Sequence, residues 1–243
     1  DILETWDAPK AHHMFTELPD GTLAYQQIDP RSYTDPESGE PDDWVGDAIA
    51  EIAPGSDAAE VVFSTWDALT PRNNDRMDHS IYGGQDWTHG NNLVYSADTD
   101  SYLLSLGHAD DLLTVDRATG TATTVWGLDG GTVSPQFDYQ HDAHLLDDGH
   151  VLLFMSDDGG AGAVEYAPAD GGLSEVWRSV FGPKPFALGQ ARRLANGNTF
   201  VNGGAGGTLR EETADGQLVW EMQTTGATVY AQFQPVSDLY TGE

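Results

Sequence analysis

Residues 139–177, YQHDAHLLDDGHVLLFMSDDGGAGAVEYAPADGGLSEVW, and residues 188–220, LGQARRLANGNTFVNGGAGGTLREETADGQLVW, follow one plan. Both stretches alternate short apolar runs with glycine-containing turns, and both end in a tryptophan. Short runs bounded by such turns are typical of antiparallel β-strands, and each stretch has room for four of them. Units of about 40 to 50 residues with four strands each are typical of β-propeller blades. The sequence therefore predicts an all-β fold, a β-propeller of four-stranded antiparallel blades.

The repeat extends over the whole chain, because five tryptophans each close a segment of this kind: Trp6, Trp66, Trp126, Trp177 and Trp220. This spacing predicts four complete blades. The first six residues, DILETW, resemble the last strand of a blade, and the stretch after Trp220 has room for only one or two strands. Pairing the two ends in one composite fifth blade would remove exposed sheet edges. A larger, six-bladed parent protein is the alternative.

The chain length favours a single domain, residues 1–243. The 243 residues are 39% hydrophobic, and all-β folds of this length commonly form one domain. Residues 30–44, PRSYTDPESGEPDDW, are rich in proline and acidic residues and lack strand alternation, which predicts an exposed loop. Residues 67–86 are predicted to form a second insertion.

The chain is strongly acidic, with 40 Asp and Glu residues against 10 Lys and Arg and a formal net charge of -30. Such a charge repels nucleic acid and anionic membranes. An excess of carboxylates with almost no lysine is similar to the surface of halophilic proteins, which stay soluble in concentrated salt because the salt screens their repulsion. An acidic mesophilic protein is the alternative. The absence of cysteine excludes disulfides and thiolate metal sites, and no apolar run is long enough to predict a membrane span.

Four histidines are candidates for a common site. His13 and His141 both lie eight residues before the glycine of the first turn in their units, and His89 belongs to the inner strand of the second unit. His108 follows the second strand of that same unit. Inner strands of a propeller line its central channel, so these imidazoles are expected to converge. A single histidine on a strand is more often a structural residue that forms hydrogen bonds. A purely structural role therefore stays an alternative for each of the four histidines.

Histidines from several strands can also bind zinc, copper or iron. The sequence has no His-x-His or HExxH element, and its Asp-rich turns at residues 98–100 and 157–159 lack the ligand pattern of a calcium loop. We therefore predict no metal site and no cofactor.

Several motifs make the chain resemble the arylsulfotransferase family. These are His89, Asn91 and Tyr95 on one predicted strand, followed by residues 103–126, LLSLGHADDLLTVDRATGTATTVW. Three further stretches match: QHDAHLLDDGHVLLF at 140–154, QARRLANGNTFVNGG at 190–204 and VYAQFQP at 229–235. The resemblance covers about two thirds of the chain, from Asp86 to about Tyr240.

The resemblance implies transfer of a sulfuryl group between phenols, without a nucleotide donor, through a sulfohistidine intermediate. His141 matches the nucleophile, and His89 and His108 match the residues that assist it. The implied partners are small aromatic sulfates and phenols, and the implied location is extracellular or at the cell surface, in a high-salt organism. Substrate-binding positions are expected at His13, Asn91, Gln190 and Tyr230.

The chain departs from the family pattern at residues 105–108, where the family usually has an arginine and this sequence reads SLGH. Arg72, Arg192 and Arg193 are the candidates to replace it. Arg192 is preferred because it begins an inner strand, and its neighbour Arg193 must point to the opposite face.

Two other function classes stay open. A propeller without catalytic activity could serve as a binding or assembly module, since fold alone does not establish function. A quinoprotein-like repeat is suggested by DRATG at residues 116–120, which occurs in one clean copy. Neither the oligomeric state nor the identity of donor and acceptor follows from the sequence.

Overall fold

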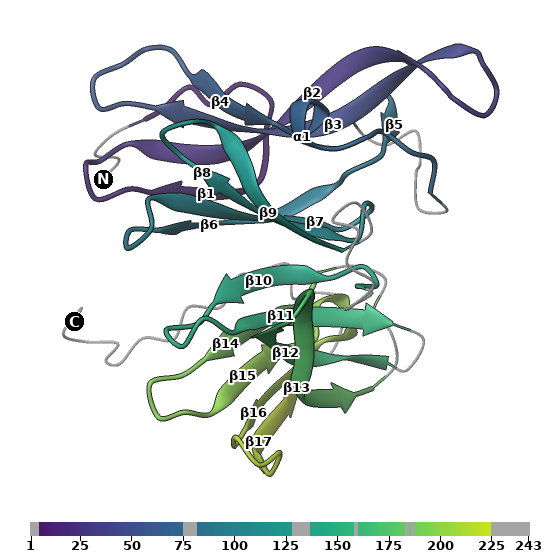
Figure 1. The fold of residues 1–243 in the computed structure, drawn as a ribbon. Helices are drawn as coiled ribbons and strands as arrows, with labels where there is room; N and C mark the ends of the chain where they lie inside the picture. Colours follow the sequence, from purple (N-terminus) through teal and green to yellow (C-terminus); the bar gives the residue numbers. More distant parts are fainter. Residues whose placement is uncertain are drawn as a thin grey trace. The chain divides into compact units, whose positions relative to one another are not determined.

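The computed structural model describes residues 5–74, 82–127, 137–157, 160–182, 185 and 188–224. These residues fold almost entirely into antiparallel β-sheets (Figure 1). The chain divides into two compact units. The first unit comprises residues 1–139 with 170–172, and the second comprises residues 140–169 with 173–243.

The first unit holds two sheets. In the first sheet, four strands pair in chain order and a short fifth strand pairs in parallel with the third: β1 (Ala11–Glu17), β2 (Leu23–Thr34), β3 (Pro41–Ile52), β4 (Glu60–Ser64) and β5 (Gln85–Asp86). The second sheet also follows chain order: β6 (Gly90–Ser96), β7 (Ser101–Leu106), β8 (Asp111–Asp116) and β9 (Thr121–Gly127).

The second unit repeats this meander twice. Its sheets are β10 (His141–Leu145), β11 (Val151–Asp157), β12 (Gly160–Ala169) and β13 (Gly172–Phe181), then β14 (Gln190–Arg193), β15 (Thr199–Asn202), β16 (Thr208–Glu212) and β17 (Leu218–Gln223). All pairings within these two sheets that are described are antiparallel. The four sheets correspond to the four predicted blades, and the Asp-rich turn expected at residues 98–100 connects β6 with β7.

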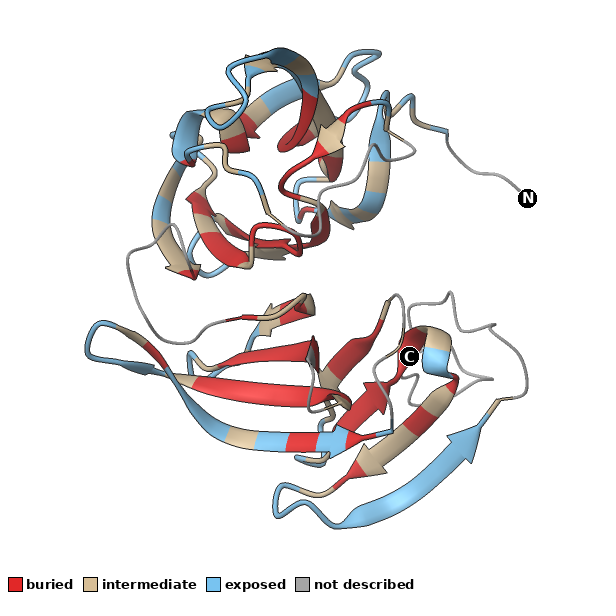
Figure 2. Ribbon diagram, turned by 90° about the vertical axis from the view of Figure 1, so that its right-hand side faces the viewer, coloured by how far each residue is buried: buried red, intermediate tan, exposed pale blue. Residues whose placement is uncertain are grey.

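Each unit has its own hydrophobic core. In the first unit, one cluster joins both sheets and contains the fully buried Trp44, Trp87 and Leu104. In the second unit, Phe154 and Val201 belong to a cluster that joins the two sheets there. Figure 2 shows the buried residues concentrated along the middle strands, as expected for sheets that pack face to face.

Most of residues 30–44 are exposed as predicted, but the prediction that they form a loop without strands is wrong. The hairpin of β2 and β3 continues through Thr34 and Pro41, so only the residues between them form the turn. Tyr33 packs on Trp44 with ring centroids 4.9 Å apart, which gives this extension an apolar contact. Proline is tolerated at position 30 because β1 pairs with β2 only as far as Gln27, and the missing N–H then faces an open edge.

Helical structure in the described residues is limited to α1 (Thr65–Ala68) and a single 3₁₀ turn (Gly204–Gly206). Trp66 therefore lies in a helix, where the sequence predicted the end of a strand. The side chain of Ser64 caps this helix by accepting a hydrogen bond from the Trp66 backbone N–H. Within the described part of the chain, no helix is long and apolar enough to cross a membrane.

The predicted composite fifth blade depends on residues 1–4 and 225–243, which lie outside the described residues. Residues 5–8 are not in a strand, and Trp6 packs against Tyr25, Ala50 and Ile52 of the first sheet. The assignment of one domain to residues 1–243 stays a prediction.

Replacement of Leu104 by alanine tests the core of the first unit. Leu104 is 0% exposed, so Leu104→Ala is expected to lower the free energy of unfolding by about 2 to 5 kcal/mol through lost burial and the cavity left behind. Urea unfolding measures the change. The matched control is Val61→Ala at a 51% exposed position, which should change stability by less than about 0.5 kcal/mol. Equal effects of the two substitutions would contradict the assigned core.

Candidate functional site

The ends of two neighbouring strands bring His89 and His108 together. The β6–β7 ladder continues beyond Gly90, because Gly107 N–H donates to His89 O (2.9 Å) and His108 N–H donates to Thr88 O (3.0 Å). His89 has a left-handed backbone with φ of 49°, next to the bulge where β6 leaves regular pairing. Bulges of this kind re-aim a side chain at a strand end.

Close packing against Asn91 favours glycine at position 107. A Cβ atom there would lie 2.5 Å from the side-chain nitrogen of Asn91, which is itself buried. The Asn91 amide therefore fills the space beside the segment in which the family usually has an arginine.

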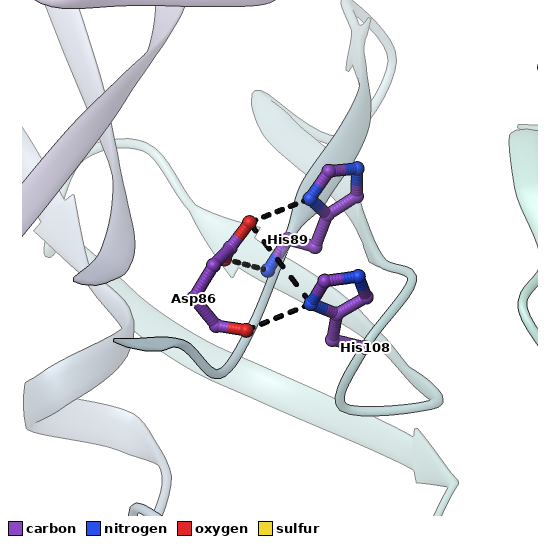
Figure 3. Close-up of side chains that lie close together, drawn as sticks. All are labelled: Asp86, His89 and His108. Carbon is purple, nitrogen blue, oxygen red and sulfur yellow. Dashed lines mark hydrogen bonds and ion pairs between the residues drawn. The ribbon is translucent and has the colours of Figure 1, made fainter. Parts of the chain in front are cut away.

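Asp86 holds both imidazoles (Figure 3). Its Oδ2 lies 2.6 Å from His89 Nδ1, its Oδ1 accepts from the His89 backbone N–H at 3.0 Å, and its backbone oxygen lies 2.7 Å from His108 Nδ1. Asp86 and His108 are buried, whereas 21% of the His89 side chain is exposed. Asp86 therefore holds both imidazole rings on their buried side, and solvent reaches the exposed part of the His89 ring.

These contacts determine which ring nitrogen carries the proton. A carbonyl oxygen only accepts hydrogen bonds, so His108 Nδ1 must donate to Asp86, and the carboxylate likewise accepts from His89 Nδ1. In the neutral form each ring then has its lone pair on Nε2. Second-shell partners of this type fix the tautomer and orientation of an imidazole.

The two rings are stacked, with centroids 4.3 Å apart and planes inclined by 19°. Tyr139 stacks beside them at 6.2 Å from His89 and 5.8 Å from His108. The ring of His13, on β1 of the neighbouring sheet, meets His89 edge-on at 5.1 Å. Three of the four predicted histidines, His13, His89 and His108, are therefore neighbours.

Behind this cluster lies a second buried carboxylate, Asp47 on β3. It accepts hydrogen bonds from Thr88 Oγ1 (2.5 Å) and Gly90 N–H (2.6 Å), and His12 Nε2 lies 2.8 Å from its other oxygen. Burial alone would raise the pKa of Asp47, but the hydrogen bond and charge of His12, with the other two donors, hold that pKa at about 2. Asp47 is therefore ionised at neutral pH.

Tyr82 lies against His12, with ring centroids 5.4 Å apart. Burial, together with the charges of Asp86 and Asp47, raises the pKa of Tyr82 to about 12. Its phenol consequently stays protonated and adds no charge to the site at neutral pH.

The ligand atoms of Asp86, His89 and His108 lie within 4.8 Å of one another, close enough to consider a metal ion. In this arrangement both Nδ1 atoms already lie on Asp86 oxygens, so a metal would have to displace those contacts. A second group of this size, Asp148, His150 and Glu165, lies in the second unit.

The second unit carries the other predicted site residues. Arg192 Nη1 contacts the buried carboxylate of Asp142, and His144 Nε2 lies 3.2 Å from it. Burial raises the pKa of Asp142 to about 6, although the guanidinium of Arg192 opposes the shift. Burial and Arg192 together lower the pKa of His144 to about 3, so His144 is neutral at pH 7. His141 and Gln190 begin the inner strands β10 and β14 of the same unit.

The predicted residues therefore fall into two groups. The first unit brings together His13, His89 and His108, with Asn91 buried nearby on β6, and the second unit contains His141, Gln190 and Arg192. Tyr230 lies outside the described residues. The roles assigned to these residues stay predictions.

Four side chains at the site were not singled out from the sequence: His12, Asp47, Asp86 and Tyr139. Arg72 was passed over in favour of Arg192, yet its Nη2 lies 2.5 Å from Ala109 O and 3.0 Å from Asp111 Oδ2, beside the turn that carries His108. The one sequence signal for Asp86 is its spacing of three residues before His89.

A comparison with known protein families shows to which family the chain belongs. Residues 6–128, half of the chain, match the arylsulfotransferase (ASST) family. The chain belongs to the arylsulfotransferase family. The matched range includes His13, His89, His108, Asp86 and the carboxylate behind them. This membership supports a sulfotransferase-like function.

Solved structures support the β-propeller fold. Virginiamycin B lyase from Staphylococcus aureus is similar with a TM-score of 0.50 and 10% identity, over 88% of this chain and 56% of the lyase. Hydrazine synthase from Kuenenia stuttgartiensis is similar with a TM-score of 0.50 and 13% identity, over 90% and 51% of the two chains. The chain thus spans about half the length of these relatives. No curated protein sequence matches it.

The ionised carboxylate of Asp47 makes a pH-dependent contribution to the stability of the fold. Because the folded pKa of Asp47 lies below its ordinary value of 3.8, its stabilisation is present above about pH 4 and is lost as the pH falls toward 2. Asp47→Asn should be less stable than wild type at pH 7, and the difference should shrink by about 2 kcal/mol on acidification to pH 2.

Urea unfolding of both proteins at pH 7, 5, 3 and 2 measures this effect. Asp57→Asn at an exposed position is the matched control and should follow wild type throughout. A stability difference for Asp47→Asn that does not change with pH would contradict the assignment.

Proposed function

We propose that this protein transfers a sulfuryl group from an aryl sulfate to a phenol, with a sulfohistidine intermediate on His141. The observation that carries the proposal is the pair of imidazoles held by Asp86 within the range that matches the arylsulfotransferase family. The acceptor and donor are small aromatic compounds, and no nucleotide takes part.

The chemistry requires a nitrogen nucleophile and a group that handles the phenolic proton. A neutral imidazole can do either near pH 7. With Nδ1 donating to Asp86, His89 and His108 keep their lone pairs on Nε2, where they can accept a hydrogen bond from a phenol or pass a proton to a phenolate. His141, at the start of β10, provides the nucleophile, attacking sulfur as the sulfur–aryl oxygen bond breaks.

The transferring group also needs positive charge near its oxygens. Arg192 is the proposed source in the second unit, where it is held by Asp142. Arg72 is the candidate in the first unit, because its guanidinium is already anchored beside the turn at His108.

Replacement of His141 tests the intermediate. Brief incubation of wild type with 4-nitrophenyl sulfate should add one sulfuryl group, measured by intact-protein mass spectrometry, and release 4-nitrophenol. Both signals should disappear in His141→Ala, because the nucleophile is absent. His150→Ala is the matched control, since His150 lies on Glu165 away from these groups, and it should behave as wild type.

Peptide mapping then locates the adduct. A sulfuryl group that maps to His141 and is lost on addition of a second phenol supports double displacement. An adduct on His89 or His108 would overturn the assignment of His141. Absence of both adduct and phenol release would overturn the proposed activity and favour a binding or assembly module.

We also propose that the protein works outside the cell in concentrated salt. The net charge of -30 supports adaptation to salt, because close carboxylates repel one another in dilute buffer and are screened in molar salt, and the extracellular location follows from the family resemblance. The thermal midpoint is expected to rise by several degrees or more between 0.05 M and 2 M KCl, measured by circular dichroism. An equal midpoint at both salt concentrations would contradict adaptation to salt.

A further inference from the structure

Asp142 directly follows His141 in the chain and lies in a bulge of β10. Its backbone is left-handed, with φ of 54°, and the register of β10 against β11 shifts between His141 and His144. A bulge re-aims the side chains beside it, and Asp tolerates the left-handed conformation better than most residues. The Asp142 side chain is only 4% exposed. The bulge thus places a buried carboxylate next to the proposed nucleophile.

This carboxylate binds the start of β14, the first strand of the neighbouring sheet in the same unit. Its Oδ2 accepts hydrogen bonds from the Ala191 backbone N–H (3.3 Å) and from Arg192 Nη1. Its Oδ1 lies 3.2 Å from His144 Nε2. The strands β10 and β14 also contact each other. Asp142 therefore connects the strand of His141 with the arginine of the next sheet.

The same contacts determine which edge of the Arg192 guanidinium is occupied. Nη1 donates to the Ala191 carbonyl at 3.2 Å as well as to Asp142, which uses both of its N–H groups. The other three N–H groups of a guanidinium belong to Nε and Nη2. No acceptor among the described residues binds these two nitrogens of Arg192, and 21% of the side chain is exposed. An edge of this kind matches two oxygens of an oxyanion.

The next residue, Arg193, is held differently. Its Nη2 contacts Glu165, its Nη1 donates to the Gly197 carbonyl at 3.2 Å, and its guanidinium lies 5.8 Å from the centre of the Trp177 ring. The Nε of Arg193 is buried. Side chains of consecutive strand residues point to opposite faces, so these contacts are separate from those of Arg192. Of the two arginines, Arg192 is the one with an accessible Nε–Nη2 edge.

We propose that Asp142 is a positioning residue that holds Arg192 by Nη1 and so directs its Nε–Nη2 edge at two oxygens of the transferring sulfuryl group. The inference rests on the proposed function, because it assigns the sulfuryl oxygens to one edge of Arg192. A guanidinium fixed before the substrate binds does not have to be ordered during the reaction.

The negative charge of Asp142 opposes the attraction between Arg192 and an anion. The benefit of the carboxylate is therefore the orientation of the guanidinium. Removal of Asp142 is expected to slow the transfer step without weakening the binding of the aryl sulfate. A contact that only stabilised the fold would not separate these two quantities.

The first test measures the orientation of Arg192 and does not depend on activity. In nitrogen-15 NMR of arginine-labelled protein, a guanidinium held at Nη1 rotates slowly and gives separate Nη1 and Nη2 signals. We expect separate signals for Arg192 at pH 7.5, assigned with Arg192→Lys, and a single averaged signal in Asp142→Ala. Glu165→Ala, which removes the partner of Arg193, should leave the Arg192 signals unchanged. An averaged Arg192 signal in wild type would overturn the proposal.

The second test separates kcat from KM with 4-nitrophenyl sulfate as donor and phenol as acceptor. In Asp142→Ala, kcat should fall at least about 10-fold, while KM for the donor should rise by less than about 3-fold. Glu165→Ala should keep both constants near their wild-type values. Equal losses of kcat in the two variants would show that Asp142 acts only through the fold.

The third test keeps Asp142 in place. Millimolar guanidinium chloride should restore at least about 10-fold of the rate lost in Arg192→Ala, because the carboxylate can hold a free guanidinium at the same position. The double variant Asp142→Ala/Arg192→Ala should show no such recovery. Equal recovery in both variants would contradict the positioning role.

The two proposals fail in different ways. If wild type forms no adduct and releases no phenol, the sulfotransferase activity is wrong, while the NMR signals still decide whether Asp142 holds Arg192. If wild type is active and Asp142→Ala keeps the wild-type kcat, the activity stands and the role of Asp142 as a positioning residue is wrong.

Discussion

One buried carboxylate, Asp47, connects the elements on which the candidate site of the first unit depends. It lies on β3, accepts from Thr88 and from the Gly90 backbone at the start of β6, and contacts His12 on β1. An ionised group in this position is tolerated only because its oxygens are occupied by donors. Those donors come from both sheets of the unit, so the same contacts that offset the cost of burial also fix the strand ends relative to one another.

Asp86, which is equally buried, repeats this principle beside the partly exposed His89. Two carboxylates thus contact three imidazoles: Asp47 lies against His12, and Asp86 holds His89 and His108. Asp86 oxygens contact Nδ1 of both His89 and His108, which leaves the lone pair of each neutral ring on Nε2. The rigid sheets set these positions before any substrate arrives, which is the condition for efficient acid–base chemistry.

Repeated patterns in the sequence predicted the sheets and the histidine cluster. Single residues of a common type gave no signal that they belong to the site. Glycine turns and closing tryptophans predicted the four sheets, and the strand positions of His13, His89 and His108 predicted that they meet. Asp47 and Asp86 could not be singled out among 40 acidic residues, since their importance comes from burial and partners far away in the chain. The extended hairpin at residues 30–44 was missed because its acidic and proline content conceals the pairing of Tyr33 with Trp44.

The close packing at Gly107 affects which substitutions this site can accept during evolution. Asn91 occupies the volume that a side chain at position 107 would need, so the two positions are not independent. A larger residue at position 107 would have to displace the Asn91 amide, so its cost depends on whether that side chain can move. Positions 91 and 107 are therefore coupled by packing, and the residue tolerated at one is expected to depend on the residue at the other.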